Sequence, residues 1–187
     1  MQTLRHAAFV FLCLAAVASA RAGEAPAADT WTDKLRAELP LLGHRNWIVV
    51  VDSAYPLQTA PGIETVFVAA DQLEVVKTLL AELARTTHVQ PTIYTDLELG
   101  YVAEKNAPGI NTYRAALAKL LAGQPVQSLP HEEIIGKLDE AGKKFRVLIF
   151  KTPLTKPYTS VFFELQCGYW NAESEQQLRD AIKAAKR

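Results

Sequence analysis

The sequence predicts a single α/β domain of three layers, in which helices flank a mostly parallel central sheet. Apolar segments rich in β-branched residues alternate with segments of helical spacing along the chain, which is the pattern of such folds. The run 47–51 is apolar without interruption, as expected of a strand buried on both faces of a parallel sheet.

The first 22 residues have the order of parts expected of a secretory signal peptide. Arg5 precedes an apolar run over residues 7–18, and small residues follow at Ala18, Ala20 and Ala22. An uncleaved membrane anchor is the alternative, but the run is shorter than the roughly 20 residues that a bilayer requires. We therefore expect an exported protein, periplasmic or secreted, with no membrane span in its mature form.

Residues 23–30, rich in Ala, Pro and Glu, are expected to form a flexible lead-in. The first half of the domain should then contain a short helix that ends at Gly43, distorted by Pro40, and strands over 47–51 and 63–68. Asp71 is expected to cap a helix that reaches about Arg85.

In the second half of the domain, the sequence pattern predicts a short strand at 92–94, a helix at 113–121, a helix at 131–141 after Pro130, and strands at 145–150 and 160–165. His88, in a polar loop, is expected to face solvent. Asn171 or Ser174 is expected to cap a last helix. The domain would thus span residues 31–170, and residues 171–187 would form a C-terminal helical extension.

Composition and motifs exclude several classes of protein. The 20 Lys and Arg residues balance the 20 Asp and Glu residues, so the chain lacks the charge expected of a nucleic-acid-binding protein. The sequence contains no C-x-x-C, H-E-x-x-H, phosphate-loop, G-x-S-x-G or G-x-G-x-x-G motif. We expect no metal and no cofactor. Because the charges balance, a neutral small molecule is the expected ligand. Cys167 is the single cysteine after residue 22, so the domain should have no internal disulfide.

Polar residues flank the apolar run 47–51, with His44 before it and Asp52 directly after it. Open α/β sheets bind their ligands beyond the carboxyl ends of strands. The pattern of Gly43-His44, seven residues, Asp52, three residues and Pro56 resembles the RbsD/FucU family of sugar mutarotases. Two later motifs are similar to that family: Leu129-Pro130-His131-Glu132-Glu133 and Pro157-Tyr158-Thr159-Ser160. The three motifs extend over roughly residues 39–168.

The resemblance implies an isomerase that opens and recloses the ring of a reducing monosaccharide without a cofactor. His44 and Asp52 would be catalytic, and His131, Tyr158 and Ser160 would bind the sugar. A proton must leave the anomeric hydroxyl while another reaches the ring oxygen, and an imidazole can carry protons near neutral pH. The resemblance also implies a homo-oligomer, pentamer or decamer, with the site at a subunit boundary.

The sequence departs from the family at two positions. Ser160 stands where the family has Asn, and Ile135 stands where a Lys is expected, with Lys137 nearby. Serine has a single hydroxyl in place of the amide, whose NH2 group donates while its carbonyl oxygen accepts, so a non-catalytic monosaccharide-binding protein on the same fold is an alternative. A structural or assembly module is another.

Each candidate residue also has a purely structural interpretation. His44 can satisfy a carbonyl at a helix end, and Asp52 can cap a turn with Ser53. His131 can be an ordinary first-turn residue, and Tyr158 can serve packing alone.

Overall fold

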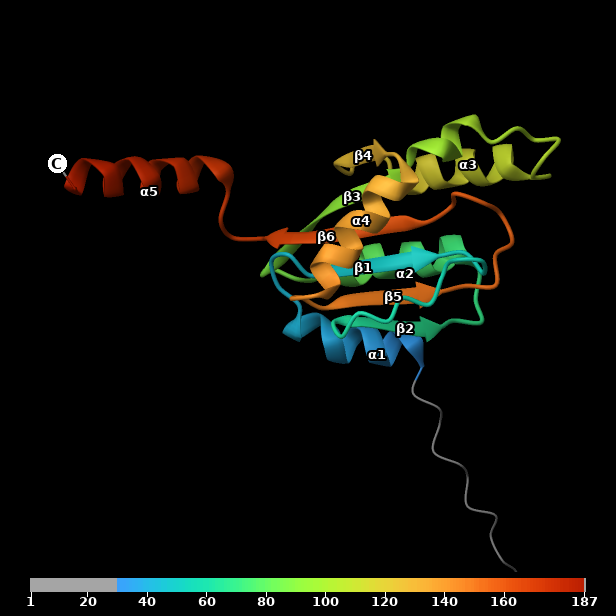
Figure 1. The fold of residues 1–187 in the computed structure, drawn as a ribbon, viewed down its shortest axis with the longest axis horizontal. Helices are drawn as coiled ribbons and strands as arrows, with labels where there is room; N and C mark the ends of the chain where they lie inside the picture. Colours follow the sequence, from blue (N-terminus) through green and yellow to red (C-terminus); the bar gives the residue numbers. More distant parts are fainter. Residues whose placement is uncertain (1–29, 187) are drawn as a thin grey trace, which may run out of the picture.

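The computed structural model describes residues 30–186 (Figure 1). Its helices are α1 (Trp31–Glu38), α2 (Gln72–Leu83), α3 (Ile110–Leu120), α4 (His131–Gly142) and α5 (Ala172–Ala185). Its strands are β1 (Trp47–Val51), β2 (Ile63–Phe67), β3 (Val89–Asp96), β4 (Val126–Leu129), β5 (Val147–Lys151) and β6 (Val161–Cys167). The expected signal peptide, and the lead-in before Thr30, lie outside the described residues.

The strands of the described chain form one mixed sheet in the order β2-β5-β1-β6-β3-β4. β5 is parallel to β1 and to β2, and β4 is parallel to β3. β6 is antiparallel to both of its neighbours, β1 and β3. Five strands therefore run in one direction, and the mostly parallel sheet expected from the sequence is confirmed.

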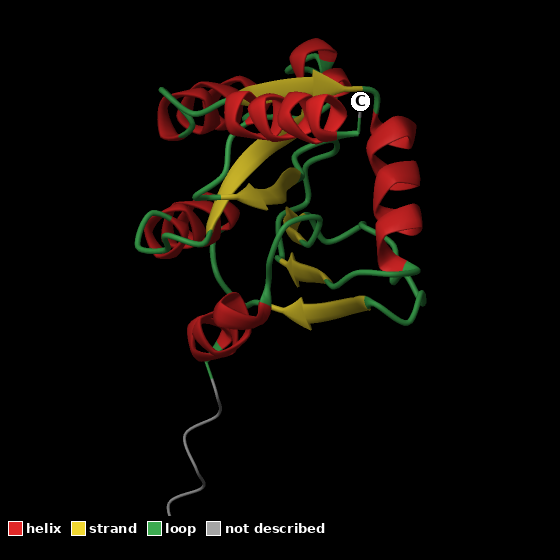
Figure 2. Ribbon diagram, turned by 90° about the vertical axis from the view of Figure 1, so that its left-hand side faces the viewer, coloured by secondary structure: helices red, strands yellow, loops and turns green. Residues whose placement is uncertain are grey.

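Helices cover both faces of the sheet, so the domain has three layers (Figure 2). One face packs against α1, α2 and α3 through side chains such as Leu35, Leu79 and Ile110. The other face packs against α4 through Ile134, Leu138 and Ala141. β1 is buried along its whole length between these layers, which explains its uninterrupted apolar sequence.

The N-terminal helix begins and ends for local reasons. The Thr30 hydroxyl accepts from the Asp33 backbone N–H, and the Asp33 carboxylate accepts from the Thr30 N–H, which together form a capping box. Helix α1 therefore begins at Trp31, directly after this cap. The expected distortion at Pro40 is found, because Leu39–Leu41 form a 3₁₀ turn after α1.

Two expectations about the middle of the chain are wrong. β3 spans eight residues, not three. A further strand, β4, which the sequence pattern did not indicate, follows α3. His88 does not face solvent: its Nε2 lies 3.2 Å from the Leu39 carbonyl oxygen and 3.1 Å from that of Leu42. It thus ties the start of β3 to the end of the first helical segment.

Helix α5 lies apart from both layers and extends away from the sheet (Figure 1). None of its side chains is buried. Asn171, one of the two expected caps, accepts from the Ser174 backbone N–H at 2.8 Å. Among the described helices, none is long and apolar enough to cross a membrane.

Candidate functional site

Most of the candidate residues meet at one edge of the sheet. The parallel strands end at this edge, and β6 begins there because it runs the opposite way. Asp52 follows β1, His131 opens α4, and Tyr158 and Ser160 precede β6. This carboxyl-terminal edge is where an open α/β sheet is expected to bind a ligand.

The centre of the edge is a carboxylate–imidazole pair. Asp96, the last residue of β3, is 2% exposed, and its Oδ1 lies 2.9 Å from Nδ1 of His131. Asp96 Oδ2 is buried without a hydrogen-bond partner among the described residues. Burial raises the pKa of Asp96 from 3.8 to about 6, although the hydrogen bond from His131 opposes the rise. A buried carboxylate with a free oxygen and a shifted pKa is a typical feature of a functional site.

Two further groups fix His131. Its backbone N–H lies 3.1 Å from both carboxylate oxygens of Glu98, which therefore caps the first turn of α4 from the segment after β3. The Tyr158 ring stands edge-on to the imidazole, with ring centroids 5.6 Å apart. Tyr158 has a φ of 56°, a left-handed conformation that a non-glycine residue adopts only under constraint.

Ser160 completes the buried part of the edge. Val161 pairs with Thr95, so the next residues along each strand, Ser160 and Asp96, are neighbours. Ser160 is 1% exposed, and its Oγ has no hydrogen-bond partner among the described residues. Two unpartnered buried oxygens at one strand edge are costly unless a ligand or water satisfies them.

Asp52 lies at the same edge, but one of its oxygens is used locally. Its Oδ1 accepts from the Ala54 backbone N–H at 2.8 Å, which is the turn-capping role considered from the sequence. Its negative charge contributes to raising the pKa of Asp96, so the two carboxylates are within electrostatic reach of each other.

His44 lies at the opposite edge. It occupies a tight turn before β1, closed by the Asn46 N–H donating to the Gly43 carbonyl oxygen at 3.1 Å, and its side chain is exposed. The five residues of β1 place it about 16 Å or more from Asp52. One chain therefore does not bring His44 together with Asp52, His131, Tyr158 and Ser160.

Comparison with solved structures identifies the fold. RbsD from Bacillus subtilis, solved in complex with D-ribose, is similar with a TM-score of 0.50 and 20% identity over 74% of this chain and 93% of RbsD. The fold is that of RbsD.

Two more structures are similar to the chain. Fucose mutarotase from Streptococcus pneumoniae, in complex with L-fucose, has a TM-score of 0.47 and 19% identity over 71% of this chain and 91% of its own. FucU from Bifidobacterium longum has a TM-score of 0.48 and 14% identity over 74% of this chain and 95% of its own. No protein-family model and no curated protein sequence matches the chain.

In this RbsD-like fold a buried polar network supports the segment that carries Tyr158 and Ser160. Gln72, the first residue of α2, donates from Nε2 to the Thr159 carbonyl oxygen at 2.5 Å and to the Tyr113 hydroxyl at 2.9 Å. Tyr113 donates to the same carbonyl at 3.0 Å, and Thr152 donates to Oε1 of Gln72 at 2.9 Å. The Thr159 carbonyl, between two candidate residues, is thereby held by two helices.

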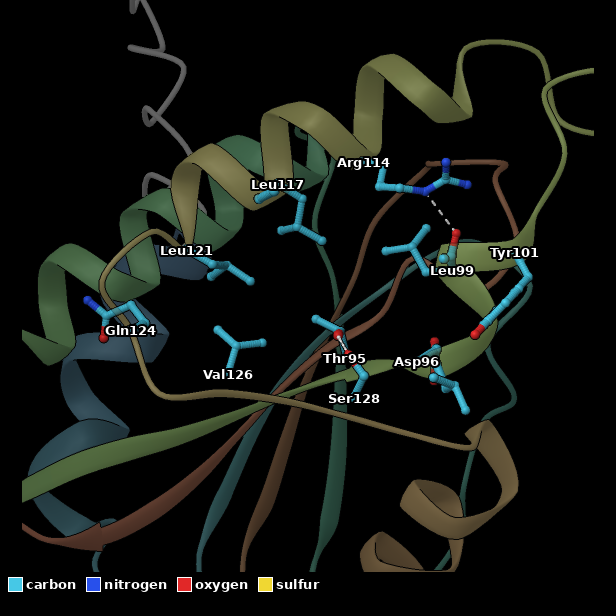
Figure 3. A pocket seen from close by; sticks show the side chains of 13 residues that line it. Thr95, Asp96, Leu99, Tyr101, Arg114, Leu117, Leu121, Gln124, Val126 and Ser128 are labelled. Carbon is cyan, nitrogen blue, oxygen red and sulfur yellow. Dashed lines mark hydrogen bonds between the residues drawn. The ribbon is translucent and has the colours of Figure 1, made fainter.

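Two cavities adjoin the edge. One, of about 560 Å³, opens beside His131 and is lined by Glu98, Pro130 and Tyr158 among others. The other, of about 720 Å³, lies between α3 and β4 (Figure 3), where Leu117 and Leu121 project toward it. None of the five residues predicted from the sequence lines the larger cavity.

Sequence reasoning missed Asp96 and Glu98. The signal was present, because Asp96 follows an apolar strand just as Asp52 does. It was overlooked because β3 was expected to end at Tyr94, which left Asp96 in a loop.

Proposed function

We propose that the protein is an exported, mutarotase-like isomerase that opens and recloses the ring of a reducing monosaccharide. The observation that carries the proposal is the buried Asp96–His131 pair, with unpartnered oxygens on Asp96 and Ser160, at the carboxyl edge of an RbsD-like sheet. Sugar hydroxyls are suitable partners for both oxygens, because each hydroxyl can donate one hydrogen bond and accept others.

The pair suits His131 to act as a base. When Asp96 is ionised it can only accept, so Nδ1 of His131 donates to it. In the neutral ring the proton is then on Nδ1, and Nε2 is free to take the proton of the anomeric hydroxyl. The developing imidazolium is stabilised by the Asp96 carboxylate, as in other carboxylate-oriented histidines.

Ring opening requires a second proton at the ring oxygen. As the O1–H proton leaves, the C1–O5 bond breaks, O5 gains a proton, and C1 becomes a carbonyl carbon that recloses on either face. We assign the second acid to His44 of another copy of the chain, since His44 is exposed and lies at the opposite edge. Asp52 orients the sugar, and Tyr158 and Ser160 bind it.

The surface around the edge supports a site shared between two copies. Leu97 is 41% exposed, Tyr101 81% and Tyr158 39%, and all three line the cavity beside His131. Exposed large apolar side chains that cluster beside polar groups are typical of an interaction surface.

The test is saturation-transfer NMR of the exchange between α and β anomers of ribose, fucose, galactose and glucose. We expect exchange faster than in buffer with at least one of them, and a loss of about 10²-fold or more in H131Q. E132Q, which alters the next, exposed residue of α4, serves as the control and should retain the rate. No acceleration with any of the four sugars would contradict the proposal.

A non-catalytic sugar-binding protein is the second candidate. The observation that favours it is that a single chain places His44 and Asp52 at opposite ends of β1. In that case calorimetry would detect a sugar, H44A would keep the affinity, and neither protein would accelerate exchange.

A further inference from the structure

A second polar cleft lies at the amino-terminal edge of the sheet, beside His44. It has a volume of about 610 Å³ and is formed between the turn before β1, the ends of β3 and β6, and the first turns of α5. This size falls within the roughly 300–1,000 Å³ of small-molecule sites. The C-terminal extension forms one wall of the cleft, and Figure 1 shows α5 beyond this edge.

The wall formed by Trp170 and the extension is held by three linked side chains. The Trp170 indole N–H donates to Oε2 of Glu175 at 2.9 Å, and Nε of Arg179 donates to Oε1 of the same carboxylate at 2.6 Å. Glu175 therefore fixes the indole and the guanidinium relative to each other. Trp170 remains 45% exposed, so much of the indole is available to a ligand.

Forming this wall gives α5 a role, although α5 contributes no side chain to the domain core. None of the side chains of α5 is buried, and an isolated helix of this length is marginal in water. The family motifs in the sequence end near residue 168, before the extension. The extension is thus an addition from which Asn171, Glu175 and Arg179 line a cleft rather than a core.

The chemistry of the cleft suits a neutral, polyhydroxylated ring. Gln90 and Gln166 provide amides, His44 an imidazole, and Arg45 a guanidinium, which together donate to and accept from hydroxyl groups. An indole face packs against the C–H face of a pyranose. An anion fits less well, because Glu175 already neutralises Arg179 and places a carboxylate at the wall.

We propose that this cleft binds a second sugar residue, so that the substrate is a reducing disaccharide or longer saccharide. The inference rests on the proposed function. His44 belongs both to the cleft and to the proposed catalytic site of a neighbouring copy. A ring in the cleft is therefore adjacent to the ring on which His44 acts, and the glycosidic bond joins the two.

The experiment compares glucose with cellobiose, maltose and lactose, in anomer exchange and in a titration of Trp170 fluorescence. We expect at least one disaccharide to have a KM at least tenfold below that of glucose, and to change the fluorescence of the wild type but not of W170F. In W170A and R179A the loss of kcat/KM with that disaccharide should exceed the loss with glucose by tenfold or more. Y169A and K183A alter exposed residues that do not line the cleft and should change neither.

The outcomes separate the two proposals. The cleft proposal would be overturned, and the isomerase kept, by two results together. Glucose would be exchanged at least as well as every disaccharide, and W170A would lose the same factor of kcat/KM with glucose and with the disaccharides. A fluorescence change with a disaccharide that is lost in R179A, without any exchange, would keep the cleft and overturn the isomerase. No fluorescence change with any of the three disaccharides would overturn the cleft.

Discussion

At neutral pH the buried carboxylate of Asp96 carries a charge that His131 compensates only in part. Its pKa is about 6 in the folded chain, against 3.8 ordinarily, because burial disfavours the ionised form. A raised pKa means that the folded chain binds this proton more tightly than the unfolded chain does. The stabilisation is therefore complete below about pH 4 and is lost as the pH rises through about 6.

Replacing Asp96 by Asn should remove this dependence, because the amide does not titrate. A difference of about two pKa units corresponds to about 3 kcal/mol. We expect the free energy of unfolding of D96N, relative to wild type, to rise by about that amount between pH 4 and pH 7. Urea denaturation at several pH values measures it.

The control for this measurement is D180N, which removes an exposed carboxylate on α5. Its stability should follow that of the wild type across the same range. If D96N also ran parallel to the wild type, the carboxylate would not be buried and shifted as described.

For individual residues, the sequence predicted the kinds of side chain in the candidate site better than it predicted what each side chain does there. Asp52 directly follows β1 and Asp96 is the last residue of β3, and only the length of β3 decides which of the two carboxylates meets His131. One carboxylate oxygen of Asp52 accepts a hydrogen bond within a turn, whereas one carboxylate oxygen of Asp96 has no partner among the described residues. His88 was misplaced for a related reason, since its carbonyl partners, Leu39 and Leu42, lie far away in the sequence.

Among the elements, α2 has a role beyond packing, because its first residue supports the loop before β6. Replacing Gln72 by Leu would remove three buried hydrogen bonds. The Thr159 carbonyl would keep Tyr113 alone, and the Thr152 hydroxyl would keep the Val51 carbonyl alone. Each hydrogen bond lost contributes about 0.5–1.5 kcal/mol to stability. We expect Q72L to lower the free energy of unfolding by about 2 kcal/mol and to speed amide exchange in residues 156–160.

Gln176 provides a matched control, since it is exposed on α5. Q176L should alter stability by less than about 0.5 kcal/mol. Faster exchange throughout the domain in Q72L, rather than near Tyr158, would show that Gln72 stabilises the fold in general and does not position this loop.

The elements that were predicted well are those with a strong local signal. The run 47–51 and the segment before Lys151 are apolar throughout because both faces of the sheet are covered. β4 has no such signal: Val126, Gln127 and Ser128 are exposed at the sheet edge, and its pairing with β3 is determined by tertiary structure. The edge position also explains why β4 is short.

In the whole molecule, the two histidines that the proposed reaction needs lie at opposite ends of the sheet. His131, Asp96 and Ser160 lie at the carboxyl end, and His44 lies at the amino end beside the extension. A single chain cannot use both on one sugar, because β1 separates them. The proposed isomerase therefore requires an assembly in which the amino end of one copy meets the carboxyl end of the next.

A head-to-tail contact forms a closed ring when its rotation closes and an open filament when it does not. The pentamer or decamer that the sequence resemblance implies requires the closed form. Light scattering should therefore give a mass well above that of one chain.

The sharper test is complementation, since H44A and H131A would each disable every site in a homogeneous ring. In rings that contain both variants at random, about a quarter of the sites would combine an intact His44 with an intact His131. We expect co-expressed, co-purified rings to recover about that share of the wild-type exchange rate, whereas homogeneous rings mixed without subunit exchange stay inactive. Absence of recovery in rings proven to be mixed would show that His44 does not act across the boundary.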